Sequence, residues 1–137
     1  MEEKIFFFAK RLNYRADALR KMRDYLGSYC KKRSVCISEF AVFITLLTEI
    51  GKNIWDHSKG GRIRLLFYDD RIEFFSDYDL RGVSLEKKIY SRANQDEENF
   101  GLGLQFIRFL ASEQEGHEQK IKVIEGNNFV FSGKLVL

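Results

Sequence analysis

The chain has 137 residues, of which 45% are hydrophobic, and its aromatic residues are 13 Phe, 6 Tyr and 1 Trp. This length fits one domain, and the share of bulky side chains suffices for one core, which excludes disorder as the general state. A formal net charge of +3 is too small to indicate a nucleic-acid partner by itself.

The sequence shows no sign of a membrane segment or of secretion. No apolar run approaches the roughly 20 residues of a membrane span, and the first residues lack the pattern of a signal peptide. We therefore expect a cytoplasmic protein without membrane contact. Its two cysteines, Cys30 and Cys36, have no CxxC spacing and no nearby His, so they are interpreted as reduced thiols.

The first half of the chain predicts a strand, two helices and a hairpin. The helices follow from apolar residues at spacings of three and four, and Ser38 is a suitable N-cap for the second. Asp69-Asp70 is the turn of the hairpin. In chain order, the predicted elements are a strand at 4–9, helices at 14–31 and 38–57, and strands at 63–67 and 71–76.

The second half begins with a long polar stretch, residues 77–100, which is expected to be functional or mobile because ordinary connections are shorter. A short helix is predicted within it, at 85–90. The remaining predicted elements are a helix from Gly101 to near Gly116, and strands at 120–125 and 129–137 around a Gly126-Asn127 turn. This order predicts an α+β fold, a two-layer sandwich in which three helices cover one face of a mixed, mostly antiparallel sheet.

Three polar residues recur at intervals of four in the second predicted helix: Glu49, Asn53 and His57. Each step of four residues turns by about 40°, so the three side chains form one slanted row beside the apolar stripe. A carboxylate and an amide oxygen one turn apart can accept protons and bind a hard cation such as Mg²⁺. The alternative interpretation is a solvated row that stabilises the helix slightly.

A second candidate feature is Gly101-Leu102-Gly103-Leu104, which follows the long polar stretch and begins the third predicted helix. Glycines allow the backbone to approach an anion, and the free N–H groups at a helix start favour phosphate. The alternative is a simple turn before a helix. The polar stretch also contains Lys87, Lys88 and Arg92, which are able to fold over a triphosphate.

These features resemble the GHKL ATPase superfamily over nearly the whole chain, and within it the small bacterial anti-sigma-factor serine kinases and the ATPase domains of histidine kinases. Residues 38–61, SEFAVFITLLTEIGKNIWDHSKGG, are similar to the N box, whose hallmark is Glu, Asn and His at intervals of four. Residues 99–111, NFGLGLQFIRFLA, resemble the second glycine box at the end of the ATP lid, with Asn99 in place of its leading glycine.

The resemblance implies a role for each matching residue. Glu49 serves as the catalytic base or orients the attacking group, and Asn53 binds the Mg²⁺ that bridges the phosphates of ATP. The residues implied to bind the phosphates are Gly101, Leu102, Gly103 and Leu104.

The first glycine box of that family, D-x-G-x-G, is incomplete here. It should fall within residues 74–84, where only Asp77, Asp79 and Gly82 remain, at a spacing that does not fit. Asp77 or Asp79 is expected to accept a hydrogen bond from the adenine amino group. The residues expected to supply positive charge as the lid closes are Lys87, Lys88 and Arg92.

One main hypothesis and two alternatives follow. The main hypothesis is a regulatory domain that binds ATP and Mg²⁺ and, like an anti-sigma factor, phosphorylates Ser or Thr on a partner such as a sigma factor or an anti-anti-sigma-like protein. The first alternative is a non-catalytic GHKL-like protein-binding module with a degenerate nucleotide site. The second is a nucleic-acid binder, prompted by Lys31, Lys32 and Arg33, although such a run is usually a solvated helix end.

A homodimer is a further expectation. The aromatic segment Phe6–Phe8 is interpreted either as an ordinary core strand or as an edge strand that contacts a second copy, because kinases of the resembled family pair through that region of the sheet.

Overall fold

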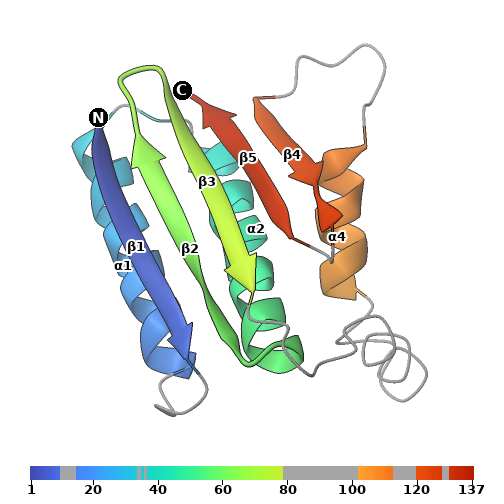
Figure 1. The fold of residues 1–137 in the computed structure, drawn as a ribbon. Coiled ribbons are helices and arrows are strands. Elements are labelled where there is room, and N and C mark those ends of the chain that lie inside the picture. The colour runs from blue at the N-terminus through green and yellow to red at the C-terminus, as the bar shows by residue number, and fades with distance from the viewer. Residues whose placement is uncertain (10–14, 34, 36, 79–101, 113–119, 128–129) are drawn as a thin grey trace.

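The computed structural model describes residues 1–9, 15–33, 35, 37–78, 102–112, 120–127 and 130–137. Within these ranges, the elements are β1 (Glu2–Ala9), α1 (Arg15–Lys32), α2 (Ile37–His57), β2 (Gly60–Phe67), β3 (Arg71–Tyr78), α4 (Leu102–Ala111), β4 (Ile121–Glu125) and β5 (Phe131–Val136) (Figure 1). Their kind and order confirm the predicted elements, except that the helix predicted at 85–90 lies outside the described residues.

Helix α4 ends at Ala111, earlier than the predicted end near Gly116. The next residue, Ser112, explains the early end. Its backbone N–H is shared between the carbonyl oxygens of Arg108 at 3.0 Å and Phe109 at 3.2 Å, and its hydroxyl donates to Phe109 at 2.6 Å. Such contacts tighten the last turn and compete with continuation of the helix.

The five strands form one open sheet in the order β1-β2-β3-β5-β4. All four neighbouring pairs are antiparallel, so the prediction of a mixed sheet is wrong for the described strands. Strands β3 and β4 run in the same direction, but β5 lies between them and pairs with both. The chain therefore crosses over through α4 without forming a parallel pair.

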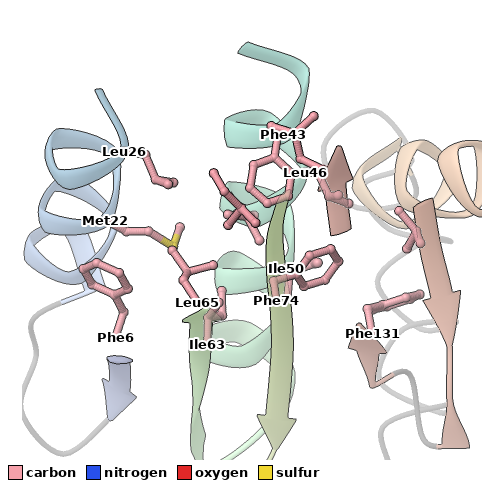
Figure 2. Close-up of a cluster of buried hydrophobic side chains, with 14 of the residues drawn as sticks. Phe6, Met22, Leu26, Phe43, Leu46, Ile50, Ile63, Leu65, Phe74 and Phe131 are labelled. Atoms are coloured by element: carbon pink, nitrogen blue, oxygen red, sulfur yellow. The ribbon is translucent and has the colours of Figure 1, made fainter. Parts of the chain in front are cut away.

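The three helices lie on one face of the sheet (Figure 1), and the core fills the space between the two layers. Strand residues alternate between the faces, so Ile63 and Leu65 of β2 and Phe74 of β3 point toward the helices and are fully buried. Figure 2 shows this cluster, whose labelled side chains are Phe6, Met22, Leu26, Phe43, Leu46, Ile50, Ile63, Leu65, Phe74 and Phe131.

The opposite face of the sheet carries charged pairs and exposed aromatic rings. Arg62 donates to Asp77 at 2.6 Å and Arg64 donates to Glu3 at 2.9 Å, while Phe7 of β1 is exposed. No helix in the described ranges is long and apolar enough to cross a membrane.

Gly133 of β5 is a position where only glycine fits. A Cβ atom there would lie 2.0 Å from the backbone oxygen of Lys122 and 2.8 Å from the Phe74 ring. The Phe74 ring of β3 and the backbone of β4 therefore both lie against the bare backbone of Gly133, where a side chain has no room.

We expect Gly133→Ala to lower the free energy of unfolding by about 1–3 kcal/mol, because the added methyl group collides with backbone and forces a shift of the strand. Gly27→Ala is the matched control, since nothing lies within 4 Å of a Cβ at that helical position. There we expect a gain of about 0.5–1 kcal/mol from helix propensity. Urea denaturation measures both; a Gly133→Ala variant as stable as the natural protein would contradict the packing described.

Candidate functional site

The candidate site lies on the second half of α2, and that helix is held in one rotational position by close packing. A Cβ at Gly51 would come within 2.9 Å of the Phe8 ring and 3.1 Å of Leu19, and one at Gly61 within 2.9 Å of Ile54. Since α2 touches β1, α1 and β2 at these points, it cannot rotate without a clash.

The predicted row of Glu49, Asn53 and His57 becomes more deeply buried toward the end of α2. The Glu49 side chain is 22% exposed, Asn53 is half-buried, and His57 is only 1% exposed. The row is thus partly covered by the fold, rather than being the fully solvated row of the alternative interpretation.

The structure brings Glu49 into direct contact with Gly103, at the start of α4. Gly103 is buried, and a Cβ there would lie 2.5 Å from Glu49 Oε2. The first N–H groups of a helix have no partner within the helix and carry partial positive charge. The Glu49 carboxylate therefore lies at the electropositive end of α4.

Lys52 forms an ion pair with the other oxygen of the same carboxylate. Its Nζ lies 3.4 Å from Glu49 Oε1, and its side chain is 40% exposed. Lys52 is not among the residues predicted for the site, although a Glu followed three positions later by Lys on a helix is a recognisable pairing signal. One carboxylate is consequently placed between an ammonium group and a helix start.

Asp77, one of the two aspartates expected at adenine, lies on the other face of the sheet. It follows the buried Ser76 in β3, and alternation directs its side chain away from the helices. Its carboxylate accepts a hydrogen bond from Arg62 Nε at 2.6 Å. The structure therefore does not bring Asp77 together with Glu49, and the adenine contact stays a prediction.

Two of the remaining predicted site residues belong to α4, and the others lie outside the described residues. Leu102 is the first residue of α4, and Leu104 is buried in the core, with 8% of its surface exposed. The predicted residues that lie outside the described residues are Asp79, Gly82, Lys87, Lys88, Arg92 and Gly101.

Tyr78 is a second polar residue that the sequence analysis did not single out. It is the last residue of β3 and the antiparallel partner of Gly61. Its hydroxyl is buried, and burial raises the pKa of Tyr78 above its ordinary value. The phenol therefore stays neutral at physiological pH, at the end of the sheet where β3 stops and α4 begins (Figure 1).

The side-chain oxygens of α2 suit a cation that takes most of its ligands from water and from a bound molecule. Among the described residues, no group of three or more His, Cys, Asp or Glu forms a metal cluster. Mg²⁺ requires few protein oxygens, because it keeps waters and binds the phosphates of its partner ligand. The Glu49 carboxylate and the Asn53 amide, one helical turn apart, fit such a role.

Comparison with protein-family models finds no match, and comparison with curated proteins finds no significant relative.

We expect Gly103→Ala to change the free energy of unfolding by between about 0 and +1 kcal/mol, since alanine favours the helix. The group that the new methyl meets is the flexible end of Glu49, which can move away. A crystal structure of the variant should show the carboxylate displaced from α4. Marked destabilisation, comparable to that of Gly133→Ala, would contradict this description of the contact.

Proposed function

We propose that this chain is a GHKL-like ATP-binding regulatory domain that phosphorylates Ser or Thr on a partner protein, in the manner of an anti-sigma factor. The observation that supports the proposal is the contact between Glu49 and Gly103. These residues are far apart in the sequence, and the resemblance assigns them to the catalytic and the phosphate-binding parts of one nucleotide site. A fortuitous resemblance of two short motifs gives no reason to expect them side by side.

The proposed roles follow from the position of each group. The start of α4 would offer backbone N–H groups to the phosphates, and the Asn53 amide oxygen would hold Mg²⁺, which would supply positive charge to neutralise the phosphates. Glu49 accepts the proton of the attacking hydroxyl or orients that hydroxyl. Phosphoryl transfer depends mainly on such positioning and charge stabilisation.

The closeness of α2 and α4 explains why these groups can act together. Both helices lie against the sheet, and Leu104 and Ile107 of α4 enter the same core as Ile50 of α2. The phosphate-binding backbone and the carboxylate are therefore carried by elements whose separation is set by core packing. Rigid support of this kind is what a positioned base requires.

One observation favours the alternative of a non-catalytic protein-binding module. Glu49 is already ion-paired with Lys52, so one of its carboxylate oxygens is engaged by another side chain of the same helix. Together with the incomplete first glycine box, this pairing fits a chain that keeps the architecture of the site while binding a partner without turnover.

We expect the protein to bind ATP in the presence of Mg²⁺, and Glu49→Gln to bind it at least as tightly while lowering phosphate transfer by about 10²-fold or more. The substitution removes the proton acceptor and keeps the side-chain size. Isothermal titration calorimetry measures binding, and radiolabelled ATP with a candidate partner protein measures transfer. The partner is drawn from sigma-factor and anti-anti-sigma-like proteins, as the resemblance implies.

Three outcomes separate the hypotheses. Absence of ATP binding at millimolar nucleotide would overturn the proposed function. Binding without transfer by the natural protein, with partner binding unaffected in Glu49→Gln, would favour the non-catalytic module. Transfer that is lost in Glu49→Gln and kept in Gly27→Ala would support the kinase.

A further inference from the structure

Lys52 places a positive charge inside the candidate site at a position for which the sequence analysis predicted none. The cations expected from the sequence belong to residues 87–92. Lys52 instead lies on α2 itself, immediately before Asn53, and is paired with Glu49. It is therefore carried by a packed helix rather than by the long polar stretch.

The Glu49–Lys52 pair is weak and accessible. Its 3.4 Å separation exceeds the roughly 2.7–2.9 Å of a strong charge-assisted hydrogen bond. Lys52 is 40% and Glu49 22% exposed, and ion pairs near the surface contribute little to stability. Breaking the Glu49–Lys52 ion pair therefore costs little free energy when an anion binds to Lys52.

The carboxylate occupies the kind of place that a phosphate prefers. Glu49 Oε1 faces Lys52, while Oε2 lies at Gly103 in the first turn of α4. Ammonium groups and helix starts are both favourable for phosphate. A phosphate group of higher charge than a carboxylate attracts the ammonium group more strongly at equal distance.

Other described cations are less suited to the role. Two of them contact α2 but are engaged there: Arg23 donates to Thr48 at 3.2 Å, and Lys120 pairs with Glu39 at 3.5 Å. Arg62 and Arg64 of β2 lie on the far face of the sheet and are held by Asp77 and Glu3. Lys59 follows the end of α2 and is exposed. Lys52 combines a place beside Glu49 with partial access to solvent.

We propose that Lys52 is a phosphate-binding residue that exchanges Glu49 for the terminal phosphates of ATP. This inference rests on the proposed function and adds a coupling to it. In the nucleotide-free protein, Lys52 neutralises the carboxylate of Glu49. When a di- or triphosphate binds, the ammonium group turns to the phosphate, and Glu49 is released to accept a proton. The base thus becomes available only when phosphate is present.

The test compares Lys52→Met and Lys52→Arg with the natural protein in calorimetric titrations with ATP, ADP and adenosine, each with Mg²⁺. We expect Lys52→Met to weaken ATP and ADP binding about tenfold, as loss of one charge-assisted contact implies, and to leave adenosine binding unchanged. Lys52→Arg should restore ATP binding to within about threefold. Lys21→Met, which removes a helix-surface pair of Lys21 with Asp17 on α1, is the matched control and should bind all three ligands normally.

Glu49→Gln provides an independent readout, because it removes the competing carboxylate while leaving Lys52 in place. We expect it to bind ATP more tightly than the natural protein, and this gain should disappear in the Glu49→Gln, Lys52→Met double variant. Equal ATP binding by Lys52→Met and the natural protein would overturn the role of Lys52 and leave the proposed function intact. Failure of the natural protein itself to bind ATP would overturn both.

Discussion

The close packing of α2 against the sheet is the constraint on which the rest of the candidate site depends. Two glycines make it possible: Gly51 on the helix lets Phe8 and Leu19 approach, and Gly61 on β2 accepts Ile54. Interiors of this density leave no room for rotation. Once α2 is fixed by these contacts, Glu49 faces α4.

The same packing also fixes the surroundings of the charged side chains of Glu49 and Lys52, whose positions would be poorly defined on an isolated helix. In water, a Glu and a Lys three positions apart interact by only a few tenths of a kcal/mol. Here Gly103 approaches one carboxylate oxygen of Glu49 while Lys52 faces the other. The carboxylate thereby lies between the Lys52 ammonium group and the first turn of α4, which is an arrangement suited to exchange with an external anion.

The two faces of the sheet make different kinds of interaction. The inner face packs against the helices, and the outer face pairs its charges across neighbouring strands, as Arg62 does with Asp77. The resemblance to the first glycine box made Asp77, with Asp79, an expected adenine ligand. Strand β3 continues to Tyr78, and the alternation of side chains along it directs the Asp77 carboxylate to the outer face. A shift of one residue in a strand exchanges its two faces.

The sequence by itself determined the kind, order and approximate bounds of the described elements, because the periodicity of apolar residues is a local property of helices and strands. It also marked Glu49 and Gly103 as candidates through spacing and through the helix start. It could not show that they touch, that Lys52 shares the carboxylate, or that β5 inserts between β3 and β4. Those features depend on contacts between residues distant in the chain, and only the packed core of the tertiary structure decides which side chains meet.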